Sequence, residues 1–238
     1  KALDRADFDV DAGEVVALIG DNGAGKSTLV KALTGNLDVD AGEVLFEGRP
    51  VVLRTPQDAS RLGVEVVHQD LALAPHLDPC ENMFLGRELM RAGLLGRLGF
   101  MDTRRMREES RQAFAQLGSA VRSVVVPVGE MSGGQKQSVA IARSVAWASR
   151  LLFLDEPTAA LGVVQTKNVL DMIRRVRDGG IAVVLISHSM PHVLEVADRV
   201  QVLRLGRRVA TYEARSTSIE ELVGAMTGAL DTVGGEAA

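Results

Sequence analysis

The sequence predicts an α/β protein with a mostly parallel central sheet. Short β-branched runs alternate with helical patterns along most of the chain, a Gly-rich loop joins an early strand to a helix, and residues 73–149 interrupt the alternation. With 238 residues the chain can form one domain with a substantial core. We expect a nucleotide-binding core at about 1–72 and 150–238, a small antiparallel β part, and a helical subdomain inserted at about 73–149.

Seven short runs of aliphatic and β-branched residues are predicted strands. In chain order they are Glu14–Ile19, Val44–Phe46, Val64–His68, Leu151–Leu154, Ile181–Ser187, Val200–Leu203 and Arg208–Tyr212. The turn residues Leu205-Gly206-Arg207 predict a hairpin between the last two. Phe8 alternates with acidic neighbours, which predicts a further strand with Phe8 in the core.

The helical segments are marked by their caps and periodicity. Thr55 is an expected N-cap with Pro56 in the first helical position, and Gly63 ends that helix. Other helical patterns are Ser27–Leu33, Glu81–Met90, Thr103–Leu117, Gly134–Trp147 and Ile219–Met226.

Composition narrows the class of protein. The 27 basic and 31 acidic residues give a net charge of −4 and form no long basic run, so we expect no nucleic-acid partner. The longest apolar runs, such as Ile181–Ile186, are far shorter than the ~20 residues of a membrane span. The chain starts at Lys1 with a strand-like segment and no signal-peptide core, so we expect N-terminal residues to be missing. The single cysteine, Cys80, fits a reducing cytoplasm and is expected to be a buried hydrophobe rather than a catalytic thiol.

The stretch from Gly20 to Thr28 matches the phosphate-binding loop pattern of a Gly, four variable residues and Gly-Lys-Ser/Thr. Glycines let successive backbone N–H groups face one anion, and the following helix N-terminus adds partial positive charge. An ordinary Gly-rich turn is the alternative, which the Lys-Ser-Thr register argues against. We therefore predict that this loop binds a nucleoside triphosphate, with Lys26 on the outer phosphates and Ser27 on magnesium. The loop residues are Gly20, Asp21, Asn22, Gly23, Ala24, Gly25, Lys26, Ser27 and Thr28.

Two carboxylates follow the apolar run Leu151–Leu154. A buried parallel strand ends beside the phosphate loop, where ligands bind in such sheets. Asp155 is therefore a candidate for the magnesium shell, and Glu156 for orienting and deprotonating the attacking water. Alone, the same run could be a core strand with polar residues at its exit.

A second anion receptor is expected at Ser132-Gly133-Gly134-Gln135, directly before a helical pattern. One nucleotide cannot easily use two receptors about 110 residues apart in one subunit, but a second subunit can supply the second one. The alternative is a flexible Ser-Gly-Gly linker.

At this point the chain resembles the ATP-binding subunits of ABC transporters, whose signature is Leu-Ser-Gly-Gly-Gln. The resemblance covers nearly the whole chain and implies a P-loop NTPase (RecA-like) fold with ATP and Mg²⁺ as cofactors. Gln69 matches the family's glutamine that senses magnesium and the membrane partner, and His188 matches the histidine that contacts the γ-phosphate. The resemblance thus implies Glu156, His188, Lys26 and Gln69 as catalytic residues and Ser27, Gln69 and Asp155 at the metal. His68, His76 and His192 match no catalytic position and are expected to be surface or packing residues.

Several runs resemble the monosaccharide-import branch (ribose, xylose, fructose type). They are Gln69–Leu73, Asn82–Glu88, Gly134–Val139 and Thr158–Val163. Two features depart from the general family pattern: Gly162 stands where an Asp usually ends the loop after Glu156, and the adenine-stacking aromatic would lie upstream of Lys1.

The resemblance implies an ATPase subunit of a sugar importer on the inner face of the cell membrane. Its partners would be a membrane permease, a second ATPase subunit (a homodimer), and indirectly a substrate-binding protein. Around Leu73–Gly86 the family takes up a permease helix, so Pro75, Leu77, Met83, Phe84 and Leu85 either line that groove or pack internally. Two other functions stay open: an ABC ATPase without a transport role, and a regulatory subunit that hydrolyses ATP weakly.

Overall fold

The computed structural model describes residues 2–119, 121, 123–159 and 161–229. Its centre is a six-stranded sheet in the order β4-β5-β6-β1-β7-β8, in which β8 alone runs antiparallel to its neighbour, and β2 and β3 form a separate antiparallel pair. The strands are β1 (Val15–Ile19), β2 (Val44–Phe46), β3 (Arg49–Val51), β4 (Val64–Val67), β5 (Leu151–Asp155), β6 (Ala182–Ile186), β7 (Arg199–Arg204) and β8 (Arg207–Glu213).

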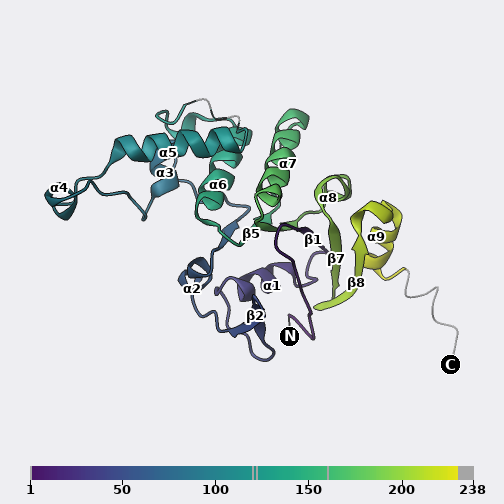
Figure 1. Cartoon of the computed structure of the whole chain (residues 1–238). Coiled ribbons are helices and arrows are strands. Elements are labelled where there is room, and N and C mark those ends of the chain that lie inside the picture. The colour runs from purple at the N-terminus through teal and green to yellow at the C-terminus, as the bar shows by residue number, and fades with distance from the viewer. Residues whose placement is uncertain (1, 120, 122, 160, 230–238) are drawn as a thin grey trace, which may run out of the picture.

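Helices lie on both sides of the sheet (Figure 1). They are α1 (Lys26–Leu33), α2 (Pro56–Arg61), α3 (Pro79–Phe84), α4 (Leu94–Arg97), α5 (Thr103–Gln116), α6 (Gly133–Trp147), α7 (Val163–Asp178), α8 (Met190–Val196) and α9 (Ile219–Thr227), with 3-10 turns at Val128–Glu130 and Ala214–Ser216.

The strand residues alternate between two hydrophobic clusters, one on each face of the sheet. On β1, Val15, Ala17 and Ile19 belong to the larger cluster with α6, α7 and α8, whereas Leu18 belongs to the smaller cluster with α1 and α2. Phe153 on β5 likewise faces the smaller cluster. Both faces of these strands are buried, which explains why their sequences are continuous apolar runs rather than alternating ones.

The helical insertion between β4 and β5 shares the larger cluster. Met83 of α3, Met106 and Phe114 of α5, and Ile141 of α6 are all buried in the same cluster as the β1 residues. Helices α3, α5 and α6 therefore share the larger hydrophobic cluster of the sheet and do not form a separate core. The division into a nucleotide-binding core and a helical subdomain stays a prediction.

Most predicted elements occur where we expected them. The ends of the predicted strands differ from the observed ones by at most one residue. The hairpin between β7 and β8 is confirmed, and Thr55 caps α2 through a reciprocal capping box with Asp58. Strand β3 was not predicted, because Pro50 within it argues against a strand. Three helices, α4, α7 and α8, have no counterpart among the predicted segments.

Two predictions were wrong. The helix predicted at Glu81–Met90 begins earlier, capped by Asp78, and ends at Phe84 because Leu85 leaves helical geometry and Gly86 takes a φ of 76°. The strand predicted around Phe8 does not form. There the Asp9 carbonyl accepts a hydrogen bond from the Gln201 side chain (2.6 Å), and Phe8 is half-buried against the smaller cluster.

Four parallel strands deliver their following loops to one edge of the sheet. Strands β4, β5, β6 and β1 are consecutive neighbours and all run in the same direction. Their carboxyl ends lead into the loops of Gln69, Glu156, His188 and the phosphate loop, respectively. The fold thus gathers at this edge four of the sequence-predicted site segments.

Cys80 is buried, as predicted. Among the described residues, no helix combines the length and the apolar character that crossing a membrane requires.

Asn82 on α3 offers a test of how the insertion is held. Its side chain is fully buried; it accepts from the Ala74 backbone N–H (2.8 Å) and donates to the carbonyls of Ala74, Leu77 and Asp78. We expect Asn82→Ala to lower the free energy of unfolding by about 1–3 kcal/mol, because buried backbone groups lose their partners. Urea denaturation measures this, with the exposed Asn36→Ala as control. Equal stability of the two variants would contradict it.

Candidate functional site

The phosphate loop is shaped by glycines that no larger residue could replace without strain. Gly23 and Gly25 have φ values of 83° and 105°, and a Cβ on Gly25 would lie 2.8 Å from Leu3. A Cβ on Gly20 would lie 2.2 Å from the Leu203 carbonyl oxygen of β7. The backbone is therefore a tight cradle between β1 and α1, with its end at the helix N-terminus.

Lys26 lies inside this cradle. Its side chain is only 8% exposed, and its Nζ donates to the carbonyls of Gly20 (2.5 Å) and Asp21 (3.0 Å). Burial lowers the pKa of Lys26, while the nearby carboxylates, above all Glu156, oppose that shift. A buried ammonium that bonds only neutral carbonyls can exchange those partners for an anion in the cradle. Ser27 beside it is exposed.

Glu156 follows β5 in a left-handed conformation with a φ of 49°, which a non-glycine residue rarely adopts. Its backbone N–H donates to the Ile186 carbonyl (2.9 Å), which ties it to the end of β6. The buried Oε1 has no hydrogen-bond partner among the described residues and lies 3.7 Å from His188 Nε2. Such an orphaned acceptor fits a site that receives a water or a ligand proton.

Burial raises the pKa of Glu156, and His188 and Lys26 only partly offset it. Two residues that the sequence places 32 positions apart, Glu156 and His188, are thus brought together by the pairing of β5 with β6. Asp155 is the last residue of β5 and is half-buried. Its carboxylate is close enough to raise the pKa of both Lys26 and Glu156 through its charge.

The Ser132–Gln135 loop is the N-terminus of α6. Ser132 is the exposed N-cap, and its side chain and that of Gln135 form a reciprocal capping box. A Cβ on Gly134 would lie 2.5 Å from Gln165 of α7, so this glycine lets the two helices approach. Among the described residues, no hydrogen bond or ion pair joins this loop to the phosphate loop or to Glu156.

Gln69 is exposed in the loop after β4. The part of this loop that follows Gln69 is held by Arg143, a residue that we did not predict. Arg143 of α6 donates to the carbonyls of Ala72 (2.8 Å) and Leu71 (3.0 Å), and Ala72 has a φ of 48°. No local sequence signal marks Arg143, because its partners lie more than 70 residues away.

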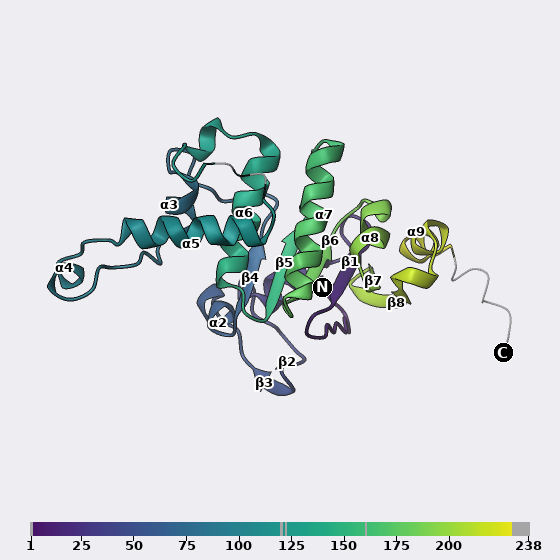
Figure 2. The same ribbon diagram turned by 45° about the horizontal axis from the view of Figure 1, so that its top comes forward.

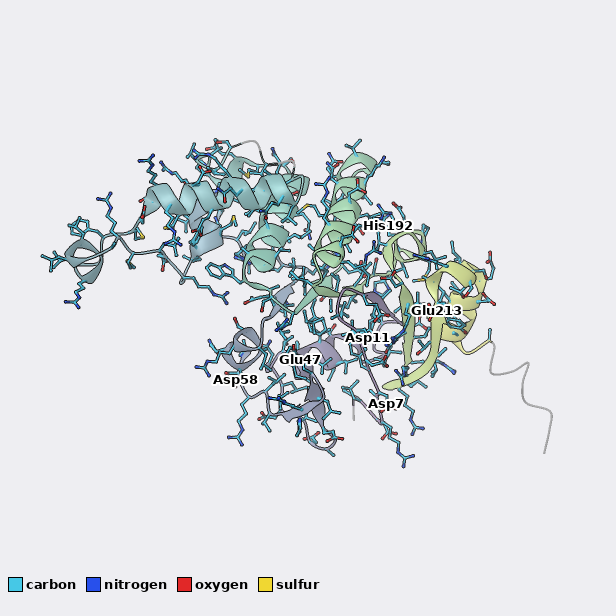
Figure 3. All side chains as sticks on the ribbon, viewed as in Figure 1. Asp7, Asp11, Glu47, Asp58, His192 and Glu213 are labelled. Atoms are coloured by element: carbon cyan, nitrogen blue, oxygen red, sulfur yellow. The ribbon has the colours of Figure 1, made fainter. Side chains whose placement is uncertain are left out.

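The loop after Glu156 contacts α8. Thr158 Oγ1 lies 3.1 Å from Nδ1 of His192, which Figure 3 labels, so His192 is a packing residue as predicted, whereas His68 and His76 are exposed. Gly162 is the N-cap of α7 and provides no side-chain cap. Ala160, which lies in the same predicted loop, falls outside the described residues.

The predicted groove residues divide into two groups. Met83 and Phe84 are 2% and 4% exposed and pack internally, whereas Pro75 and Leu85 are exposed. Leu77 is half-buried and belongs to neither group. An open cavity of about 530 Å³ lies next to this region, between α2, β4 and Arg87. Arg87 pairs there with Glu65 (2.9 Å) and bonds Ser60, and its guanidinium stacks over Trp147 of α6.

The described residues contain no group of three or more His, Cys, Asp and Glu that could hold a metal ion. The side-chain oxygens at the site, from Ser27 and Asp155, suit a hard cation that brings further ligands with it. A magnesium ion carried in by phosphate oxygens fits this donor set.

Glu156 allows a prediction that needs no nucleotide. Because the folded chain holds a proton on Glu156 more tightly than the unfolded chain does, the contribution of Glu156 to stability falls as the pH rises past the ordinary carboxyl value of 4.5. Glu156→Gln removes this loss. We expect the variant to melt above wild type at pH 8, by about 2–4 °C for each kcal/mol recovered, and at the same temperature at pH 4. A melting curve series from pH 4 to 8 measures this, and a gap that is constant with pH would contradict it.

Comparison with known proteins agrees with this geometry. The family model described as ABC transporter matches residues 3–159. The chain is 46% identical over 230 residues to the fructose import ATP-binding protein FrcA of Rhizobium meliloti, covering 96% of this chain and 88% of the relative. It is 40% identical over 227 residues to the xylose/arabinose import ATP-binding protein XylG of Sulfolobus acidocaldarius, covering 95% and 88%.

A third relative, the ribose import ATP-binding protein RbsA of Chromobacterium violaceum, is 40% identical over 228 residues, which are 96% of this chain but only 44% of that protein. Among solved structures, the ADP conformation of MJ1267, an ATP-binding cassette of an ABC transporter, shares the fold with a TM-score of 0.79 at 24% identity, covering 99% of this chain and 93% of that one. The chain therefore belongs to the ABC transporter family and is one of its ATPases.

Proposed function

We propose that this chain is the ATPase subunit of a monosaccharide importer. Its relatives named for fructose, xylose/arabinose and ribose import support the class of sugar. The observation that carries the catalytic part is the unpartnered, buried Oε1 of Glu156 beside His188 and within the field of Lys26.

ATP and Mg²⁺ are the proposed cofactors. The phosphate loop, residues 20–28, would hold the phosphates through its backbone N–H groups, and Lys26 would leave the carbonyls of Gly20 and Asp21 to bond the outer phosphates. Ser27, Asp155 and Gln69 would hold the metal, directly or through water. Magnesium supplies charge neutralisation on the β- and γ-phosphates when bound.

Glu156 would orient the attacking water and accept its proton. Its raised pKa brings its basicity closer to the operating pH, as a general base requires. His188, half-exposed at the end of β6, would contact the γ-phosphate and fix the Glu156 carboxylate. Lys26 would stabilise the negative charge that spreads over the phosphate oxygens during in-line displacement.

The second anion receptor, Ser132–Gln135, would act on the nucleotide of another subunit. Ser132 and Gly133 are exposed at the start of a fifteen-residue helix, where partial positive charge favours an anion. Two copies arranged head to tail would close two sites, each with a phosphate loop from one copy and a Ser132 loop from the other. The ATP-binding cassette MJ0796, which was solved as a dimer bound to ADP and Pi, shares this fold with a TM-score of 0.74, and this likeness of fold is compatible with such pairing.

The membrane permease would dock beside the cavity between α2 and β4, and this ATPase would then lie on the inner face of the cell membrane. The paired Arg87 and Glu65 line that cavity together with His68, which directly precedes Gln69 in the chain. Exposed Leu85 lies two residues before Arg87 in the chain. The substrate-binding protein would act through the permease, and the sugar would be selected there.

The first test is Glu156→Gln. We expect ATP binding to persist while steady-state hydrolysis falls by about 10²-fold or more, because the base is lost but the cradle is not. The variant should also form an ATP-dependent dimer in size-exclusion chromatography. Glu213→Gln, on β8 beside α9 in Figure 3, is the matched control and should hydrolyse ATP normally. Unchanged hydrolysis in Glu156→Gln would remove it from the base role.

The second test separates the two half-sites. Lys26→Ala and Ser132→Arg should each abolish turnover alone. Mixed in equal amounts they should recover about a quarter of wild-type activity, because half of the dimers then contain one intact site. Hydrolysis assays of the mixture measure this recovery. Absence of any recovery would contradict the shared site, even if the chain still bound ATP.

A further inference from the structure

Residues 89–101, here called the arm, form a projecting hairpin with α4 at its tip. Met90 and Met101 form an antiparallel bridge, and the Arg91 N–H donates to the Phe100 carbonyl (2.9 Å). In both Figures 1 and 2 the arm extends from the start of α5 away from the rest of the chain. At the base, Leu89 packs against the larger hydrophobic cluster.

The arm has a defined conformation set by glycines. Gly93 and Gly99 have φ values of 72° and 85° on either side of α4. A Cβ on Gly96 would lie 1.9 Å from the Arg91 carbonyl oxygen, so the chain at the tip folds too closely for any other residue. The apolar side chains of the arm are therefore presented in a fixed arrangement.

Those apolar side chains are unusually exposed. Six of the nineteen exposed large apolar side chains among the described residues lie in this arm, with exposed fractions of 46–71%. So much apolar surface on one small projection is unfavourable in water, unless a membrane or another molecule covers it. The six are Met90, Leu94, Leu95, Leu98, Phe100 and Met101.

The charges of the arm have one sign. Arg91 and Arg97 are exposed and make no ion pair in the described part of the chain, and the arm contains no Asp or Glu. This contrasts with the whole chain, whose net charge is −4. Apolar side chains flanked by arginines are the composition of segments that insert into the interface of an anionic membrane.

We propose that the arm inserts into the anionic phospholipid surface of the membrane, with Leu94, Leu98 and Phe100 among the acyl chains and Arg91 and Arg97 on lipid phosphates. This proposal rests on the proposed function, because an ATPase subunit bound to a membrane permease would lie close to the membrane. Two other occupants fit the charges less well. A second arm would bring arginines against arginines, and the cytoplasmic loops of permeases carry an excess of Lys and Arg.

Vesicle co-sedimentation of the full chain tests this. We expect binding to phosphatidylcholine vesicles containing 30% phosphatidylglycerol, and about 10-fold weaker binding to pure phosphatidylcholine, since each basic residue near an anionic surface contributes substantially. Arg91→Glu with Arg97→Glu should lose the preference for phosphatidylglycerol. Leu94→Ser, Leu98→Ser and Phe100→Ser combined should abolish binding to both vesicles. Val52→Ser, at an equally exposed apolar residue outside the arm, should bind as wild type.

The arm variants should keep the melting temperature and the basal ATP hydrolysis of wild type, because these side chains contribute to neither the core nor the nucleotide site. Wild type that fails to bind anionic vesicles, or arm variants that bind them as wild type does, would overturn the proposal. Arm variants that bind vesicles normally but no longer bind the permease in detergent would assign the arm to the permease instead. In each of these results, intact ATP hydrolysis would leave the proposed function standing.

Discussion

The parallel pairing of β4, β5, β6 and β1 is the constraint on which the rest of the site depends. Parallel neighbours must end at the same edge, so a buried sheet forces the polar residues that follow its strands into one place. The pairing of Asp155 with Ile186 at the last position of β5 and β6 sets Glu156 beside His188. A shift of register by one residue would turn every side chain of β5 to the opposite face and separate these two groups. Catalytic geometry here is therefore a consequence of core packing, mainly of the aliphatic residues buried on both faces of β5 and β6.

This edge of the sheet holds opposite charges that water only partly solvates. Burial lowers the pKa of Lys26 and raises that of Glu156, so each ion is less favourable than it would be in water. Neither is neutralised by a direct ion pair with the other in the described structure: Lys26 bonds carbonyls, and Glu156 Oε1 has no hydrogen-bond partner. Groups arranged in this way have unsatisfied bonding capacity that a phosphate and a water could fill. A site that satisfied its own charges completely would bind nucleotide less well.

The sequence was sufficient for the strands of the six-stranded sheet and the loops at their ends, because long aliphatic runs and the Gly-Lys-Ser-Thr pattern are strong local signals. It was not sufficient where two distant segments decide the outcome. Helix α3 stops at Phe84 although the pattern continues, since the chain there turns outward to form the arm. Phe8 is not in a strand, because Gln201 from β7 bonds the Asp9 carbonyl instead of a ladder partner. Arg143 could not be identified either, since only the packing of α6 on the β4 loop gives it partners.

Helix α6 connects the two halves of the proposed mechanism within one rigid element. Its N-terminus carries the Ser132 loop. Its later turns are tied to the segment around Gln69, where Arg143 bonds Leu71 and Ala72 and Ser144 bonds Val66 (3.4 Å), and to α3, where Trp147 bonds Met83 (3.0 Å). Trp147 also lies under Arg87 and edge-on to Phe84, next to the cavity proposed for the permease. A helix of fifteen residues transmits a displacement along its length with little bending. We therefore infer that movement of a partner at the Arg87 end would change the position of Ser132 relative to a neighbouring nucleotide. The same contacts would act in reverse, because coupling between two binding equilibria is reciprocal.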